Sequence, residues 1–315
     1  MSLKGGSTPD LKAERLGGEV SRPQTPTLLV AGLIYGGWLA LTLFHAKIPL
    51  PLAVLAGGWL VAWHGSLQHE IIHGHPTPWR RLNTALAICP LALWLPFELY
   101  RTSHLEHHAT DALTLPGRDP ESRYINDRPD LAAAFRYAVE MAQAPLIGHL
   151  LLGPLIKVGG FLFDEARTLL RGDGAHWRAW SLHIVLAAVV LAWVLAVCKM
   201  SLGQYLLIFV YPGVVLTLVR SFAEHRAEAN PAHRIAVVER APVLGLLFLN
   251  NNLHALHHAR PDLAWHQLPA VYKANRAQIL QVNGGLVYDG YGEVFARFLF
   301  RPHDEIIHPS LGGER

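Results

Sequence analysis

Three short clusters of histidine are the residues in this sequence best suited to chemistry. The first is His69-Glu70-Ile71-Ile72-His73-Gly74-His75, and the other two, at residues 104–108 and 254–258, both have the form His-x-x-His-His. A neutral imidazole nitrogen is a good ligand for zinc, copper, iron and nickel. Clusters of this kind therefore predict a metal site rather than a set of surface histidines.

The spacing inside the clusters indicates how metal ions would be shared. On a helix, side chains four residues apart lie on one face, so His69 and His73 would point the same way. In each His-x-x-His-His cluster the first and last histidines share a face, and the middle one is rotated by about 100° from its neighbour. Eight or nine histidines are too many for one zinc ion, which takes three or four protein ligands. Two ions with four or five ligands each fit the number, and the spacing does not separate iron from another metal.

The elements that would hold these clusters are membrane spans. The chain has 315 residues and is 51% hydrophobic but only 16% charged, with a mean hydropathy of +0.23, whereas soluble domains carry about 25% charged residues. A span needs about 20 mostly apolar residues. Four runs without Lys, Arg, Asp or Glu approach or reach this length, at residues 27–44, 49–68, 180–198 and 202–219. Short connections within the first pair and within the second pair predict two tight helical hairpins.

The distribution of positive charge predicts the orientation of these spans. The two hairpin tips carry one basic residue each, Lys47 and Lys199, so the other 25 of the 27 lysines and arginines lie on the opposite side. Positive residues are enriched on the cytoplasmic side of membrane proteins. Both termini and the three clusters are therefore expected in the cytoplasm. The small net charge of +3 is attributed to the orientation of the spans in the membrane. The sequence has no basic helix interleaved with aromatic residues, so a nucleic acid partner is not expected.

The composition divides the chain into three regions. Residues 1–26 are polar and rich in Gly and Pro, which predicts a disordered cytoplasmic arm. Residues 27–265 are expected to form the membrane domain. Residues 266–315 are expected to form a cytoplasmic region that packs on the cytoplasmic helices of that domain, its cap. The apolar stretches 84–97 and 146–163 are broken by proline and glycine and predict interfacial or re-entrant segments. The expected fold is an all-α integral membrane protein, with four transmembrane helices in two hairpins and a cytoplasmic helical cap that holds a histidine-rich di-metal site.

The order of the clusters, HExxHGH and then two HxxHH boxes among two hairpins, resembles the membrane fatty acid desaturase and hydroxylase superfamily over residues 27–265. The resemblance implies a non-haem di-iron centre that uses O2 and two electrons to attack an unactivated C–H bond of an acyl chain. Family members have a further histidine after the last span, for which His225 is the candidate. The resemblance thus implies nine iron ligands: His69, His73, His104, His107, His108, His225, His254, His257 and His258.

Two positions depart from the family pattern. Some desaturases have an asparagine four residues before the extra histidine, as a water-mediated ligand, where this chain has Ser221. The complete ligand set of one iron is therefore left open. His75 adds a histidine to the first box and is either a further ligand or a surface residue; its spacing of two from His73 is unfavourable for sharing a helical face.

Several polar residues near the boxes admit two interpretations. Glu70 and Glu106 either accept the second ring N–H of a ligand histidine or face solvent and ion-pair there. The three asparagines at 250–252 either support a ligand or cap the following helix. Asp119 and Glu121 lie in a loop with Pro116, Gly117 and Pro120. A plain surface turn is favoured for this loop over pairing of its carboxylates with box histidines or with the arginine-rich loop.

The remaining histidines are not expected to bind metal. Three lie in or beside apolar stretches and are interpreted as hydrogen-bonded packing or interfacial residues: His64, His149 and His183. No role is assigned to the other six, which are His45, His176, His233, His266, His303 and His308.

Desaturation is the favoured reaction, because the compact box spacing resembles that of bacterial acyl-lipid desaturases. This also implies a location in the bacterial inner membrane. The alternative is hydroxylation or oxidative decarboxylation of an acyl or alkyl chain by the same centre. The sequence has no GxGxxG nucleotide motif, so the electrons would come from an external donor of ferredoxin or cytochrome type.

Two other classes of protein share part of the pattern. The HExxH at residues 69–73 is also the motif of zinc metallopeptidases, in which the glutamate is the general base. A protease of that type would not need two HxxHH boxes. Metal transporters bind their cargo near the middle of the bilayer, whereas these clusters lie beyond the spans.

Overall fold

The structure is a computed structural model that describes residues 20, 22–125 and 131–311. It is built largely from helices, which confirms the all-α expectation. The α-helices are α1 (Thr25–Phe44), α2 (Leu50–Ile72), α3 (Arg80–Ala87), α4 (Phe97–Ala109), α5 (Leu131–Gln143), α6 (Leu146–Leu151), α7 (Gly153–Leu170), α8 (Gly174–Ala192), α9 (Leu202–Tyr205), α10 (Tyr211–Glu224), α11 (Pro242–Leu247), α12 (His254–Ala259), α13 (Leu268–Val282) and α14 (Tyr291–Phe298). Two short strands, β1 (Val237–Val238) and β2 (Val287–Tyr288), pair in parallel, with Val237 opposite Val287.

Four helices of the described part are long and apolar enough to cross a membrane: Thr25–Lys47, Leu50–Ile72, Gly174–Val197 and Leu202–Glu224. They match the four predicted apolar runs, which confirms the number of candidate spans. Each helix extends beyond its apolar run into polar residues at one end. Backbone hydrogen bonds continue there because they do not depend on apolar side chains. The third, for example, starts at Gly174 because Asp173 caps it by accepting the backbone N–H groups of Ala175 and His176.

The predicted N-terminal arm is hardly tested by the structure. Most of residues 1–26 lie outside the described part, and the last two of them, Thr25 and Pro26, already belong to α1. Proline suits this place, because the first turn of a helix has no partner for its backbone N–H.

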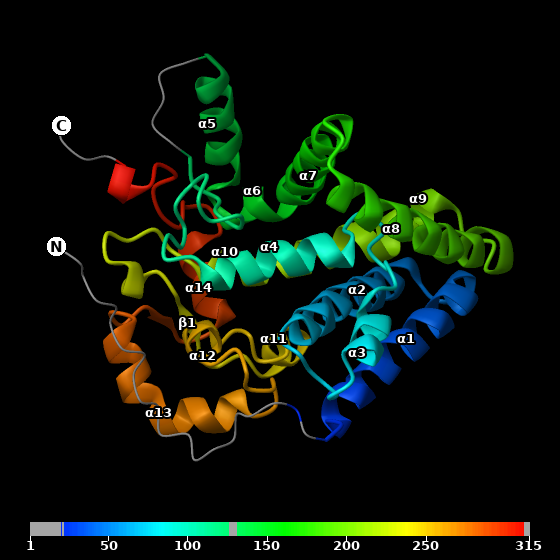
Figure 1. Ribbon diagram of the computed structural model, residues 1–315, viewed down its shortest axis with the longest axis horizontal. Coiled ribbons are helices and arrows are strands. Elements are labelled where there is room, and N and C mark those ends of the chain that lie inside the picture. Colours follow the sequence, from blue (N-terminus) through cyan, green and yellow to red (C-terminus); the bar gives the residue numbers. More distant parts are fainter. Residues whose placement is uncertain (1–19, 21, 126–130, 312–315) are drawn as a thin grey trace.

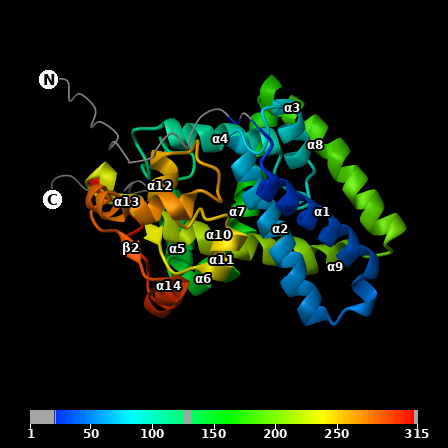
Figure 2. The ribbon, with the colours of Figure 1, turned by 90° about the horizontal axis from the view of Figure 1, so that it is seen from below.

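The long helices and the short C-terminal helices occupy opposite ends of the molecule. In Figures 1 and 2, α1, α2 and α8 lie towards the right, and α12, α13 and α14 lie towards the left. α2 packs on α1 and α10, while α4 packs on α2 and α8. α8 also packs on α7. The arrangement of the spans as two hairpins under a cap stays a prediction.

The contact between α2 and α10 depends on glycines. A Cβ atom on Gly213 of α10 would lie 2.5 Å from Cγ1 of Val61. A Cβ on Gly57 of α2 would lie 2.4 Å from the carbonyl oxygen of Ile208, in the π-helical segment Leu206–Val210 that leads into α10. Small residues let membrane helices approach closely, and dispersion contacts then stabilise the pair. α2 carries the first box, and α10 ends directly before His225. The distance between these two helices therefore also sets the distance between the histidines that they position.

The Gly213→Val variant is expected to unfold at a lower temperature than the wild-type protein. Its side chain would have to displace Val61, and such overpacking costs about 1–3 kcal/mol. The measurement is the thermal unfolding midpoint of the purified protein in detergent. Gly36→Val is the control, because Gly36 lies in α1 and a Cβ there would meet no atom of the described residues within 4 Å. Equal midpoints for the two variants would contradict this account of the packing.

Hydrogen bonds between side chains fix the spans and the loop at residues 88–96. Trp38 of α1 donates from Nε1 to the hydroxyl of Tyr205 at 3.0 Å. The same hydroxyl donates to the carbonyl oxygen of Leu91 at 2.7 Å. Trp193 donates from Nε1 to Thr42 Oγ1 at 3.0 Å. Polar groups that would be unsatisfied in lipid are thus paired between helices.

The two segments expected at the membrane interface have different structures. Residues 84–97 comprise the end of α3 and an irregular loop, which is held where Gln68 Nε2 donates to the carbonyl oxygen of Ala87 at 2.8 Å. Residues 146–163 lie in α6 and α7. Neither segment is among the four candidate spans of the described residues. Their position relative to a bilayer stays a prediction.

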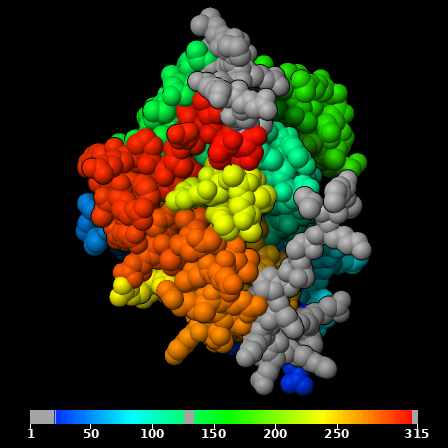
Figure 3. Space-filling model, turned by 90° about the vertical axis from the view of Figure 1, so that its left-hand side faces the viewer, coloured from blue at the N-terminus to red at the C-terminus, as the bar shows by residue number. Residues whose placement is uncertain are grey.

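The C-terminal region packs on the segments that carry the boxes. α13 packs on α12, which carries the third box, and Asn283 Nδ2 donates to the carbonyl oxygen of Ile235 at 3.0 Å. Figure 3 shows this region, in orange and red, spread over one face of the molecule. The boundary proposed at residue 265 stays a prediction.

Candidate metal centre

Nine histidines converge from separate parts of the chain, in two groups. Within each group, one ring nitrogen of every residue lies within 4.8 Å of those of all the others. The structure brings together all nine residues that the resemblance implied as ligands. The five-histidine group is His69, His73, His104, His108 and His257, and the four-histidine group is His107, His225, His254 and His258.

Helical geometry explains the division of the first two boxes. His69 lies in the last turn of α2 and His73 is the residue that ends this helix, so both reach the five-histidine group. In α4, His104 and His108 lie four residues apart and join the same group. His107 is rotated from His108 by about 100° and joins the four-histidine group. One helix thereby serves two sites.

The third box divides in the opposite sense. In α12, His254 and His258 belong to the four-histidine group and His257 belongs to the five-histidine group. His225 follows α10 directly, in an extended conformation with φ −130° and ψ 143°, and its backbone pairs with Ile235. This break of the helix turns the His225 side chain towards α12.

Two carboxylates fix the tautomers of the second box. Glu121 Oε1 accepts a hydrogen bond from Nδ1 of His104 at 2.9 Å, and Asp119 Oδ1 accepts one from Nδ1 of His107 at 2.8 Å. A carboxylate can only accept, so the ring proton of each histidine lies on Nδ1. The lone pair of each Nε2 then points into the site. This arrangement of carboxylate, histidine and metal orients ligands in metalloproteins.

An amide and a third carboxylate orient the last box. His254 Nδ1 lies 3.2 Å from Asn251 Oδ1 and 3.3 Å from Glu224 Oε1. Asn251 donates its own Nδ2 to Glu224 at 2.9 Å, so its oxygen faces the histidine. Arg220 Nε lies 3.0 Å from Glu224 Oε1 and balances the buried charge. Nε2 of His254 is therefore also an acceptor.

The free ring nitrogens face one another across each group. Nε2 of His254 lies 2.9 Å from Nε2 of His225, and Nε2 of His73 lies 3.1 Å from Nε2 of His104. Nε2 of His69 is buried and has no hydrogen-bond partner among the described residues. Lone pairs gathered in this way repel one another unless a cation lies between them. The donor set therefore fits one metal ion in each group.

The surroundings keep most of these imidazoles neutral, which is the form that binds metal. Burial and then the charge of neighbouring histidines lower the pKa of His108 and of His225 to about 3. The same two causes lower the pKa of four more of the nine to well below the ordinary value: His73, His254, His257 and His258.

His107 behaves differently because of its carboxylate neighbours. Burial lowers the pKa of His107, but the hydrogen bond to Asp119 and the charge of Glu121 outweigh burial and raise the pKa above its ordinary value. Burial raises the pKa of Glu121, but the interaction with His104 and the nearby His107 and Arg220 outweigh burial and lower the pKa to well below its usual range. Glu121 is thus a carboxylate held in its charged form beside the second box.

The supporting residues were only partly predicted. The favoured interpretation of Asp119 and Glu121 as members of a surface turn is wrong, because both carboxylates bind box histidines. Glu106 is exposed, and Glu70 accepts the backbone N–H of Trp265, so neither was found to hold a ligand. Sequence reasoning missed Glu224, whose only signal was its place beside His225.

The two departures from the family pattern also have definite positions. Ser221 is exposed, and its hydroxyl donates to the carbonyl oxygen of Leu218, so it faces away from the groups. His75 belongs to neither group. It is 2% exposed, and its Nδ1 accepts a hydrogen bond from Gln24 at 2.9 Å. His75 is therefore neither a member of a histidine group nor a surface residue, so the structure matches neither of the two expectations for it.

The histidines interpreted as packing residues have such contacts. His64 bonds to the hydroxyl of Tyr35 at 3.1 Å, and His183 donates to the carbonyl oxygen of Leu93 at 2.8 Å. His149 packs against an aromatic ring of α10. His303, to which no role was assigned, is also buried and bonds through both ring nitrogens.

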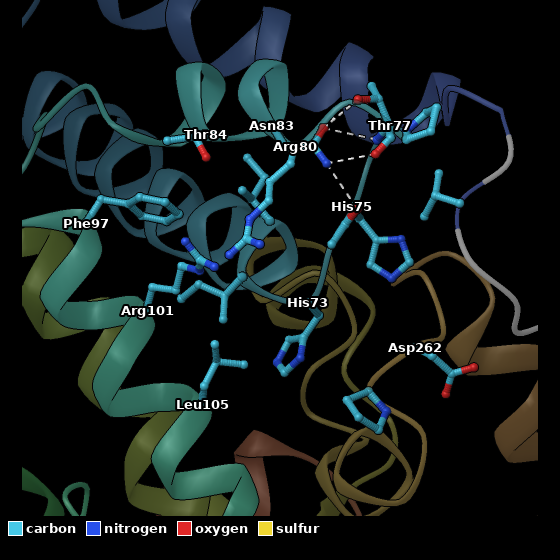
Figure 4. A pocket seen from close by; sticks show the side chains of 16 residues that line it. His73, His75, Thr77, Arg80, Asn83, Thr84, Phe97, Arg101, Leu105 and Asp262 are labelled. Atoms are coloured by element: carbon cyan, nitrogen blue, oxygen red, sulfur yellow. Dashed lines mark hydrogen bonds between the residues drawn. The ribbon is translucent and has the colours of Figure 1, made fainter.

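A cavity of about 680 Å³ opens on the five-histidine group. His73 forms part of its wall, with Arg80 of α3 and with Arg101 and Leu105 of α4. Figure 4 shows Arg80 and Arg101 on one side of His73 and Asp262 on the other. This cavity gives the five-histidine group a connection to the surface.

A second cavity, of about 220 Å³, lies between α2, α10 and the loop at residues 88–96. Next to the metal centre its wall includes Tyr100, Glu121 and Arg220. Deeper among the spans it is lined largely by apolar side chains of α2 and α10 and by glycine. Its largely apolar lining suits a flexible apolar chain.

Residues 46–290 match the family model described as fatty acid desaturase, a range that includes all nine histidines. A comparison with curated proteins found none that matches the chain.

Proposed function

The chain belongs to the fatty acid desaturase family, a family of oxidoreductases for fatty acyl chains, and we propose that it is a membrane-embedded di-iron desaturase that depends on O2. The observation that carries the proposal is the position of two converging histidine groups beside an apolar cavity. Such a site places oxidising metal next to a bound hydrocarbon.

We assign the ligands of the two irons to the two histidine groups. The five-histidine group would hold one iron and the four-histidine group the other. Bound iron supplies the oxidising power with which O2 breaks an unactivated C–H bond. The protein contributes the ligand geometry, which Asp119, Glu121 and Asn251 maintain through their hydrogen bonds to ring Nδ1 atoms.

The second cavity would hold the acyl chain and keep water from it. Its largely apolar lining offers few hydrogen bonds to a bound acyl chain. The carbon atoms of the substrate would therefore be positioned by the shape of the cavity wall. Loss of two hydrogens from adjacent carbons gives the alkene. These hydrogens, two electrons from a donor and two protons reduce O2 to two waters. The two electrons require a partner, for which we propose a ferredoxin- or cytochrome-type protein.

The zinc-peptidase alternative requires a free carboxylate at Glu70. In a protease with the HExxH motif this residue activates a metal-bound water. Here the Glu70 carboxylate accepts the backbone N–H of Trp265 at 3.0 Å. Its carboxylate is thereby engaged in holding the loop after α12, which favours a structural role.

We also propose that the metal centre and both termini face the cytoplasm of a bacterial cell, with the spans in its inner membrane. The support is the excess of lysine and arginine outside the two hairpin tips. Cysteine introduced at Lys199 would then react with a membrane-impermeant thiol reagent in intact spheroplasts, and cysteine at Lys273 in α13 would react only after lysis. The reverse pattern would contradict the orientation.

The reaction is tested by lipid analysis in a host that expresses the protein. Mass spectrometry should detect an acyl chain that has lost two hydrogens in cells with the wild-type protein. His107→Ala should abolish this product, because His107 belongs to the four-histidine group. The position of the new double bond follows from fragmentation of the product.

Other products would change the assignment. Gain of one oxygen atom would make the protein a hydroxylase, and loss of the carboxyl carbon would make it a decarboxylase. Purified protein with one zinc ion and no iron would contradict the di-iron proposal. Unchanged lipids, with a ferredoxin and its reductase co-expressed, would contradict an acyl-lipid substrate.

A further inference from the structure

Gly65 is the one residue of α2 in the second cavity wall that has no side chain. It lies one helical turn before His69, and the cavity face of the helix continues through Val61 and Gln68. A Cβ atom built on Gly65 would meet no atom of the described residues within 4 Å. The space in front of this glycine is therefore part of the cavity.

This open glycine differs from the glycines that pack helices together. A Cβ on Gly213, which lines the same cavity, would collide with Val61 at 2.5 Å. Gly213 is therefore needed for the contact between α10 and α2. Gly65 makes no such contact, so close packing does not account for it. Alanine also has a higher helix propensity than glycine by about 1 kcal/mol, so the helix itself does not need glycine here.

The position of Gly65 divides the cavity along its length. On one side lie Tyr100 and Glu121, and Glu121 bonds to His104 of the metal centre. On the other side lie Val61 and Ala62, deeper in the span. From His69 to Val61 the helix rises by about 12 Å at 1.5 Å per residue. Along α2, Gly65 lies between these two parts, so a chain that follows this wall from the metal centre into the deep part passes Gly65.

We propose that Gly65 is a specificity-determining residue that sets the width of the acyl path beside the metal centre. The missing side chain lets the methyl end of a long acyl chain continue into the deep part of the cavity. A larger residue closes that part and restricts the enzyme to chains that end before it. The inference rests on the proposed function, since it takes the second cavity as the acyl site.

The test measures binding separately from catalysis. The purified full-length protein in lipid nanodiscs is irradiated with analogues of stearate and of laurate, each carrying a photoreactive diazirine near its methyl end. Labelled peptides are identified by mass spectrometry. Gly65→Leu is compared with wild type and with Gly36→Leu. Gly36 is a matched control, because it is also a glycine of a long apolar helix with open space at its Cβ, but it is exposed on the outside of the bundle.

We expect Gly65→Leu to capture the stearate analogue about tenfold less than wild type, since a single misfit in an apolar pocket has effects of this order. Capture of the laurate analogue should be retained, and Gly36→Leu should behave like wild type with both probes. Gly65→Ala should lie between. Unchanged stearate capture in Gly65→Leu would overturn the inference. So would equal loss of both analogues, since that would indicate collapse of the whole cavity.

Lipid products distinguish this inference from the proposed function. If the wild-type protein captures the probes in the cavity but oxidises no lipid, the proposed desaturase activity fails and the assignment of Gly65 stands as a binding result. If wild type forms unsaturated chains and Gly65→Leu forms the same chains in the same proportions, only the assignment of Gly65 fails. A shift of the products towards shorter chains supports both.

Discussion

Replacement of His257 by alanine should reduce the bound metal from two ions to one per chain and abolish oxidation of the acyl chain. His257 is 4% exposed and joins the five-histidine group, where its Nε2 lies 3.1 Å from that of His108. Alanine removes one of the five ring nitrogens of this group. A centre that needs both ions then has one, so activity is lost rather than reduced. Metal content by mass spectrometry of the purified protein and product analysis are the measurements.

The complementary variant tests the division into two groups. His254→Ala removes a ligand of the four-histidine group, so the remaining ion should lie in the five-histidine group. His176→Ala is the control, because His176 bonds to Glu165 far along the chain from the boxes and should leave two ions bound. Wild-type metal content in both His254→Ala and His257→Ala would contradict the assignment of these residues as ligands.

The sequence was sufficient to predict which histidines of one box share a helical face, because that geometry is local. Spacings of three and four residues determine which side chains share a helical face. That rule alone separates His107 from His104 and His108 on α4, as the two groups have them. The number of spans was also predictable, since an apolar run of sufficient length needs no tertiary contact to be recognised.

The residues that orient the ligands could not be predicted in the same way. Asp119 and Glu121 lie in a loop, and a loop with proline and glycine is usually a surface turn. What makes these carboxylates functional is the path of the loop back over α4, which depends on contacts such as Asp119 with the backbone N–H of Thr114 at 2.7 Å. Glu224 is likewise defined by a partner 27 residues away, Asn251.

The glycines of the spans show the same limit. In the sequence Gly57, Gly65 and Gly213 all stand in apolar runs and look alike. In the structure Gly57 and Gly213 lie against a neighbouring element, whereas Gly65 faces open space. Only the placement of α10 beside α2 separates a glycine that packs helices from one that widens a cavity.

Asp119→Asn should weaken metal binding in the four-histidine group by about 10- to 100-fold, the usual effect of losing the partner that orients a ligand. Asp119 accepts three hydrogen bonds, from His107 Nδ1 at 2.8 Å and from the backbone N–H groups of Thr114 and Glu121 at 2.7 and 2.9 Å. An asparagine can accept through only one of its two terminal atoms. If its NH2 group faces Thr114, a buried N–H loses its acceptor, at a cost of about 1–3 kcal/mol. If it faces His107, the ring proton moves to Nε2 and the ligand atom is blocked.

With its NH2 group towards His107 the asparagine acts on the ligand itself, and with its NH2 group towards Thr114 it loosens the loop that holds position 119 against His107. Both effects reach the four-histidine group through His107, so that group should be weakened more than the five-histidine group. Titration of the metal-depleted protein with ferrous iron should show one site of wild-type affinity and one weakened site. Asp111→Asn is the matched control, because Asp111 lies in the same loop but is exposed and pairs with Arg118. Its titration should equal that of wild type. If Asp119→Asn weakened both sites equally, the carboxylate would act through the stability of the whole loop, and the proposed orientation of His107 by Asp119 would be wrong.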